Sequence, residues 1–283
     1  MKSLSVKSGF GIGALITVVA AIIALPVRTS QFFTIIESDT GFYSETNIGV
    51  YVVYAMIVIS VIASVVLGFA KRKNLEYSLA TEKRPGFGIL SLTAAIGALS
   101  DSVKCIMEFM SENSDGQTLI FVYAAQAVFA LFSAIFFMAI GISSLSGKTN
   151  GSEHRVISLA PVIWSILRLV YRFSRTISYI RVSELMFEML MIVFLVLFFM
   201  AFAQANTNIN AKGNLWKVAA YGMPAVLLCL LCFVPRFIVT VSGNAHLLVE
   251  QSPIEYCDIS NAAFILSAVL TRVTDKITSG EQA

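Results

Sequence analysis

The chain has 283 residues, of which 57% are apolar and only 13% are charged, whereas soluble domains carry about 25% charged residues. This composition excludes an ordinary soluble domain and predicts an all-α bundle of membrane-spanning helices. The net charge of +3 is too small to indicate nucleic-acid binding. In a membrane protein, the basic residues are instead expected to face anionic lipid headgroups.

Eight apolar segments approach the roughly 20 residues that a helix needs to cross a bilayer core. The expected spans cover residues 9–27, 47–70, 87–110, 118–145, 157–177, 184–205, 216–240 and 259–275. The eighth span is short and weakly apolar, so a bundle of seven spans is the alternative. No soluble domain is expected, because the connections are short, and residues 1–283 are predicted to form a single transmembrane domain.

The first apolar segment resembles a signal peptide, because Lys2 and Lys7 precede it. However, the run is longer than a usual signal peptide core, and Pro26-Val27-Arg28 does not resemble a small-residue cleavage site. We therefore interpret the segment as a retained first span that ends at this proline.

The connections between the spans alternate in charge. If the N-terminus is cytoplasmic, thirteen of the twenty Lys and Arg residues fall in inner segments and three fall in outer segments. Cytoplasmic loops of membrane proteins carry such an excess of basic residues. The pattern predicts that both termini are cytoplasmic. It also favours eight spans, since Arg272 and Lys276 would otherwise lie outside.

Ionisable residues inside the spans are costly and usually face a protein interior or a wet cavity. Asp101, Lys104 and Glu108 are three and four residues apart, so they share one helix face, and Arg168 and Arg172 share a face of the fifth span. Further polar residues at similar depth are Gln126, Glu188 and Arg236. All of them fall in the outer halves of their spans in this topology.

These positions predict a polar, outward-facing cavity about half a bilayer deep. The candidate ligand-binding residues are Arg168, Arg172, Asp101, Lys104, Glu108, Glu188, Arg236 and Gln126. Arg168 and Asp101 lie deepest and are the first candidates for an ion pair. The functional interpretation is a site where guanidinium groups bind a small anionic or polar solute. The alternative is a set of structural salt bridges that lock the helices together.

The sequence therefore favours a permease or permease component. The alternative is a sensor or accessory subunit that transports nothing and works with a partner membrane subunit. An outer-leaflet lipid-modifying enzyme is a further candidate, although no hydrolase or metalloprotease motif is present. The C-x-x-C of Cys229 and Cys232 is interpreted as two small apolar helix residues, and no cofactor or metal is expected. The expected location is a bacterial plasma membrane.

Overall fold

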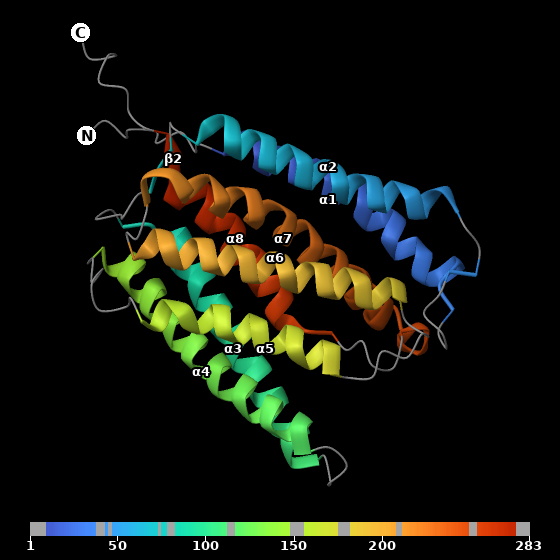
Figure 1. Ribbon diagram of the computed structural model, residues 1–283. Helices are drawn as coiled ribbons and strands as arrows, with labels where there is room; N and C mark the ends of the chain where they lie inside the picture. Colours follow the sequence, from blue (N-terminus) through green and yellow to red (C-terminus); the bar gives the residue numbers. More distant parts are fainter. Residues whose placement is uncertain are drawn as a thin grey trace.

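The computed structural model describes the helices and the connections closest to them. The described residues are 10–37, 43–44, 47–72, 75–77, 83–111, 117–147, 156–174, 182–207, 211–248 and 254–275. Within them, the α-helices are α1 (Gly11–Thr34), α2 (Ile48–Lys71), α3 (Pro85–Ser111), α4 (Gln117–Ser146), α5 (Ala160–Ser174), α6 (Val182–Asn206), α7 (Ala211–Val241) and α8 (Tyr256–Arg272). These helices form an elongated bundle (Figure 1), which confirms the predicted all-α class.

Six helices in the described part of the chain are long and apolar enough to cross a membrane. This finding indicates a multi-pass membrane protein. The exceptions are α5, with 15 residues, and α8, with 17 residues. At 1.5 Å per residue they measure only about 23 and 26 Å, against about 30 Å for a hydrocarbon core. A short 3-10 turn, η1 (Ile157–Leu159), precedes α5 and lengthens it at its start.

The structure gives different helix boundaries for two of the predicted spans. α1 does not end at Pro26 but continues to Thr34, with the proline inside the helix. A proline removes one backbone hydrogen bond, and the packing of α1 against α7 extends the helix regardless. α8 begins at Tyr256 rather than at residue 259, and it ends at Arg272. The last predicted residues of that span form the strand β2 (Val273–Asp275) instead.

The short strand β2 pairs antiparallel with β1 (Leu75–Tyr77), which follows α2. This pairing brings the connection between α2 and α3 to the end of α8. At the same end of the bundle, the Arg84 amide donates to the Ser144 carbonyl, and the Arg272 guanidinium donates to the Ser144 hydroxyl. The start of α3 and the ends of α4 and α8 therefore meet at one end of the molecule.

α7 is the central helix of the bundle and packs against α1, α2, α6 and α8. α1 and α2 lie along one side of the bundle, and α3 and α4 lie along the opposite side (Figure 1). The core of α7 is apolar and includes Cys229 and Cys232, which are buried and form no disulfide. The burial of both side chains in the apolar core supports the interpretation of the C-x-x-C as packing residues.

Small residues allow α3 to approach two neighbours closely. A Cβ atom added at Gly97 would lie 1.9 Å from Ser260 Oγ and 3.1 Å from the Cys257 Cα atom, both on α8. On the other side of α3, Gly88 and Gly141 face each other, and an added Cβ on either would lie 3.0 Å from the other's carbonyl oxygen. Such close backbone approach is typical of helix contacts in membranes.

Large apolar side chains cover much of the outer surface. Examples are Leu15 and Ile22 on α1, Ile62 and Val66 on α2, and Phe121 on α4, all of which are exposed. In water, a surface with so many exposed apolar side chains would promote aggregation, but hydrocarbon chains solvate it well. The surface therefore agrees with a lipid bilayer as the environment of the bundle.

Candidate functional site

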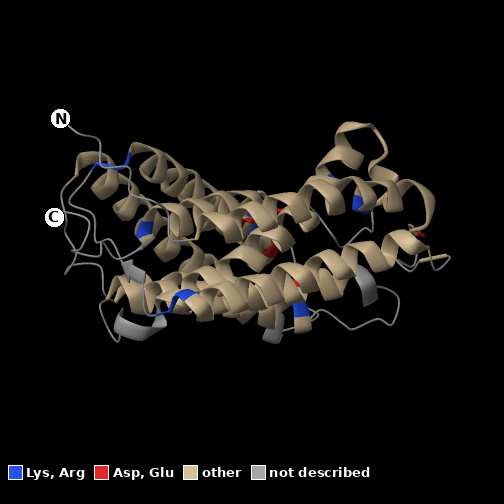
Figure 2. Ribbon diagram, turned by 90° about the horizontal axis from the view of Figure 1, so that it is seen from above, with Lys and Arg blue, Asp and Glu red and all other residues tan. Residues whose placement is uncertain are grey.

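Buried charged side chains from five helices meet in the interior of the bundle. Figure 2 shows acidic and basic helix positions next to one another there. α5 supplies Arg168 and Arg172, which lie one turn apart on the same face and are both buried. The charged residues of the cluster lie in the halves of their helices that are farther from β1 and β2, and Glu255 immediately precedes α8 at that same end.

Arg168 binds two carboxylates at the start of α8. Its Nη2 donates to Asp258 Oδ1 at 2.8 Å and also to the Glu255 carboxylate. The guanidinium lies over the Trp164 ring, with 5.6 Å between its central carbon and the ring centre. The positive charge of Arg168 is thus balanced by two carboxylates, and its guanidinium contacts an aromatic face.

The predicted pair of Arg168 and Asp101 was wrong. Asp101 Oδ2 instead accepts hydrogen bonds from the Trp164 indole nitrogen at 2.7 Å and from Gln126 Nε2 at 3.1 Å. These two neutral donors come from α5 and α4, so Asp101 links α3 to both helices. Arg168 takes its partners from α8, which begins earlier than the sequence had indicated.

Glu255 is the centre of the cluster. It immediately precedes α8, and its carboxylate contacts Arg168, Arg172 Nη2 at 2.7 Å and Lys104 Nζ at 3.0 Å. Three cationic groups from α3 and α5 therefore converge on one side chain. The convergence anchors the start of α8 to both helices.

A second junction joins α5, α6 and α7. Glu188 of α6 contacts Arg172 Nε at 3.3 Å and Arg236 Nη2 at 2.6 Å. Both Glu188 and Arg236 are only 3% exposed. Because Arg172 contacts Glu255 and Glu188, the two junctions form one continuous chain of ion pairs, which we call the ion-pair network. Its members are Lys104, Arg168, Arg172, Glu188, Arg236, Glu255 and Asp258.

Neutral hydrogen bonds surround the ion-pair network on the side of α4. The hydroxyls of Tyr123 and Tyr171 are 2.9 Å apart, and Ser102 Oγ donates to the Ala127 carbonyl at 3.0 Å. Together with Gln126, these contacts hold α4 against α3 and α5. The second half of α3 is thereby fixed relative to both neighbouring helices.

The structure places seven of the eight predicted site residues in the ion-pair network or next to it. Gln126 and Asp101 bind each other, and the remaining five belong to the ion-pair network. The eighth, Glu108, is half-buried on the same face of α3 and lines the same small space.

Very little open space remains among the charged side chains. The volume enclosed by Asp101, Glu108, Gln126, Tyr171 and their neighbours is about 10 Å³, which is enough for roughly one water molecule. Gln126 Oε1 and Arg168 Nη1 are buried polar atoms without a hydrogen-bond partner among the described residues. We expect a water molecule to satisfy at least one of them.

Three members of this region were not predicted from the sequence. Asp258 lies in the first turn of α8 and Glu255 immediately precedes the helix, but the eighth span was expected to start after both residues. Trp164 was treated only as an apolar residue, although its indole nitrogen binds Asp101. A search for acidic residues spaced by three at the start of a weak span would have found the first two.

Arg28 is a further buried charge, and it was expected in an outer connection. It lies inside α1, is 2% exposed, and donates to Gln31 Oε1 at 2.9 Å and to the Tyr43 hydroxyl at 2.8 Å. Its guanidinium also lies over the rings of Phe32 and Phe187. This group holds the end of α1 against α6, away from the ion-pair network.

One group of potential metal ligands occurs among the described residues. Asp101, Glu255 and Cys257 place their ligand atoms within 4.8 Å of one another. However, Glu255 already contacts three cationic groups, and Asp101 accepts two hydrogen bonds. A metal ion would have to compete with all of these partners, so we assign no metal to this position.

Comparison with protein-family models, with curated proteins and with solved structures found no match to this chain. Its function is therefore inferred from its own geometry.

Proposed function

We propose that the chain is a membrane sensor or accessory subunit that does not itself transport a solute. In this proposal the ion-pair network is a structural brace, which means that it holds the helices in place and binds no ligand. The observation that carries this proposal is the pairing within the network. Each of its four cations contacts at least one of three carboxylates, and the enclosed space is about 10 Å³. A solute would have to separate the ion pairs of the buried arginines before it could bind to their guanidinium groups.

Charge balance supports the same proposal. The four cations, Lys104, Arg168, Arg172 and Arg236, are matched by the network's three carboxylates and by Asp101 next to them. A site selective for an anion would be expected to carry an excess of positive charge. Within a bilayer, breaking such pairs exposes charges that cost at least about 2.5–3.5 kcal/mol each.

The second candidate is the binding or movement of a small polar or anionic solute, as in a permease. The observation in its favour is that Arg168 and Arg172 converge on Glu255, so an anion that displaced this carboxylate would meet both guanidinium groups. The two candidates differ in what the arginines do. In a brace they are needed for folding, whereas in a binding site they are needed for ligand affinity.

We propose eight crossings in one membrane domain, with both termini in the cytoplasm. The pairing of β1 with β2 supports an even number of crossings between them, since both strands lie at one end of the bundle. The basic residues Lys71, Arg72, Lys83, Arg84 and Arg272 gather at that same end, and the cytoplasmic side is where such residues are retained.

Arg168→Gln separates the two candidates. If the network is a brace, this variant loses about 3–5 kcal/mol of unfolding free energy, because two buried carboxylates lose a partner. The measurement is reversible denaturation of the purified protein in mixed micelles, alongside uptake of radiolabelled carboxylates, phosphate and amino acids into proteoliposomes. Lys83→Gln, at an exposed position, is the matched control and is expected to change stability by less than about 0.5 kcal/mol.

The proposal fails if Arg168→Gln leaves stability unchanged and abolishes uptake that the unmodified protein supports. That combination would assign the arginine to a solute site and make the chain a permease.

A further inference from the structure

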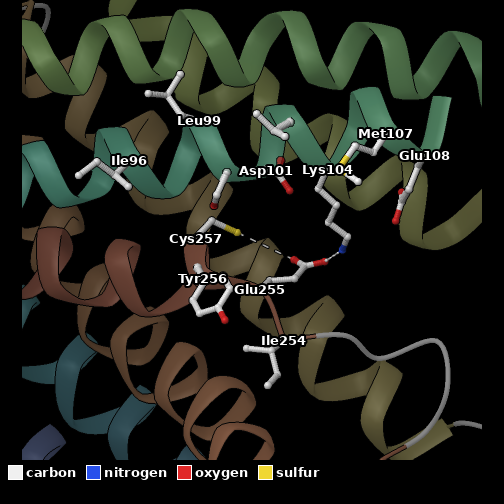
Figure 3. Close-up of a pocket in the computed structure, with 12 residues that line it drawn as sticks. Ile96, Leu99, Asp101, Lys104, Met107, Glu108, Ile254, Glu255, Tyr256 and Cys257 are labelled. Atoms are coloured by element: carbon white, nitrogen blue, oxygen red, sulfur yellow. Dashed lines mark hydrogen bonds and ion pairs between the residues drawn. The ribbon is translucent and has the colours of Figure 1, made fainter. Parts of the chain in front are cut away.

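A large groove lies between the second half of α3 and the start of α8, next to the small space inside the ion-pair network, with which it shares Lys104 and Glu255. Its volume is about 670 Å³, which is within the usual range for small-molecule sites. Figure 3 shows the residues of α3 along one wall and Ile254, Glu255 and Tyr256 along the other. Three charged side chains of α3 line it, and they are Asp101, Lys104 and Glu108.

The groove exists because α3 extends beyond the start of α8. The two helices touch at Gly97, where an added Cβ would meet Ser260 and Cys257 of the first turns of α8. α3 continues from there to Ser111, a distance of about 21 Å at 1.5 Å per residue. One face of this extension is not covered by helix α8.

The walls of the groove are apolar and open toward the bilayer. Ile96, Val103 and Met107 follow one face of α3 and are 66%, 56% and 65% exposed, and Tyr256 opposite them is 60% exposed. In a membrane, such a surface contacts hydrocarbon rather than water. The natural occupant of an apolar groove at this position is the acyl chain of a lipid.

Lys104 supplies the polar end of the site. Its Nζ is 3.0 Å from Glu255 Oε1, and its side chain remains 31% exposed, whereas the network arginines are almost fully buried. An ammonium group has three donors, and the contact with Glu255 uses one of them. A phosphate oxygen in the groove is a suitable acceptor for a remaining donor.

The depth of Lys104 agrees with a phosphate position. α3 has 27 residues and is therefore about 40 Å long, close to the full thickness of a bilayer with its headgroup regions. Lys104 lies about 10 Å from the end of the helix at Ser111, near the boundary between hydrocarbon and headgroups. A lysine at this depth can extend its ammonium to the phosphate level.

We propose that the groove between α3 and α8 binds one glycerophospholipid with an amine-bearing, zwitterionic headgroup. Its phosphate contacts Lys104, and its acyl chain lies along Ile96, Val103 and Met107. Glu108, four residues beyond Lys104 on α3, also lines the groove, and its carboxylate disfavours a headgroup with net negative charge and attracts an ammonium. The site shares Lys104 and Glu255 with the ion-pair network, but it does not depend on the proposed function, since a permease with the same helices would hold the same groove.

The test is native mass spectrometry and thermal unfolding of the delipidated, detergent-purified full chain. The probes are phosphatidylethanolamine, phosphatidylglycerol, diacylglycerol and inorganic phosphate. We expect one bound phosphatidylethanolamine per chain and a rise in melting temperature that depends on its concentration. Met107→Trp, which fills the groove without changing charge, should weaken this binding by about tenfold or more.

Ile89→Trp is the matched control, because Ile89 is an exposed α3 residue outside the groove, and it should leave binding unchanged. Lys104→Gln should reduce the preference for phosphatidylethanolamine over diacylglycerol. If Lys104→Gln does not fold, the unmodified chain provides the test. If it binds diacylglycerol and phosphatidylethanolamine equally well, a phosphate contact is excluded.

Three other results would overturn the proposal. Tighter binding of phosphatidylglycerol would exclude the zwitterionic headgroup, and equal stabilisation by inorganic phosphate would exclude a lipid. A change from dimer to monomer in Met107→Trp, without bound lipid, would show that a second copy of the chain occupies the groove.

Discussion

At the scale of single residues, Glu188 shows how the bundle accommodates charge. It lies on α6 and contacts an arginine from α5 and another from α7. An isolated buried ion pair gives little net stability, because desolvation offsets the Coulomb attraction. Removing one partner is costly, however, since it leaves the other charge buried without compensation. The network therefore specifies which helices are neighbours more than it adds stability.

Glu188→Gln is expected to destabilise the protein by about 3–5 kcal/mol, because Arg172 and Arg236 both lose this carboxylate. Arg236→Gln removes only one of these contacts. The double variant should cost less than the sum of the two single variants, with a coupling of about 0.5–3 kcal/mol. Reversible denaturation in mixed micelles measures all three. Additive effects would show that the pair contributes no interaction energy.

At the scale of helices, α3 is the element that connects the site to the fold. One face carries Asp101 and Lys104 to the charge cluster, while Gly97 lets α8 approach closely enough for Asp258 to reach Arg168. A larger residue at position 97 would separate the helices and lengthen this contact. The position of α8 thus depends on a residue without a side chain.

Gly97→Ala is expected to lower the unfolding free energy by about 1–3 kcal/mol, as overpacked cores do. The added Cβ would lie 1.9 Å from Ser260 Oγ, so one helix must shift. Thermal unfolding in detergent would measure the loss, and adding Ser260→Gly should restore part of it.

Gly86→Ala is the matched control on the same helix, because a Cβ there meets nothing within 4 Å. It should be neutral or slightly stabilising, since alanine favours helix over glycine. Equal effects of the two substitutions would mean that the contact between α3 and α8 is not tight in the membrane.

At the scale of the whole molecule, the two short strands show which connections between helices lie at the same end of the bundle. β1 and β2 are far apart in sequence, yet they pair at the end where α3 begins and α8 ends. Both short helices, α5 and α8, belong to the ion-pair network. These two helices are shorter than the thickness of a bilayer core. Ion pairs with neighbouring helices therefore contribute to holding them in the bundle, in addition to their apolar surface.

The proposed topology predicts that reporters at two distant positions give the same result. Alkaline phosphatase or a fluorescent protein attached after Arg72, or attached at the C-terminus, should report the cytoplasmic side in both fusions. The strand pairing requires the two sites to share one side of the membrane. If the two fusions report opposite sides of the membrane, either β1 does not pair with β2 or α8 does not cross the membrane.

Much of the helical architecture could be predicted from the sequence, because helix formation in a bilayer depends on local hydrophobicity. Spacings of three and four residues also placed Asp101 with Lys104, and Arg168 with Arg172, on shared faces. The errors occurred at boundaries. Pro26 was expected to end α1 but lies inside it, and Glu255 and Asp258 were placed outside the last span.

The sequence by itself determined that the chain is a bundle of apolar helices with charged residues near one end of their spans. Apolar runs and helical periodicity are properties of neighbouring residues, so they can be read without the fold. Only the tertiary structure decided the pairing, in which Arg168 binds Asp258 and Glu255 rather than Asp101. Such partners lie on different helices, and their distance depends on how those helices pack, which no local spacing encodes.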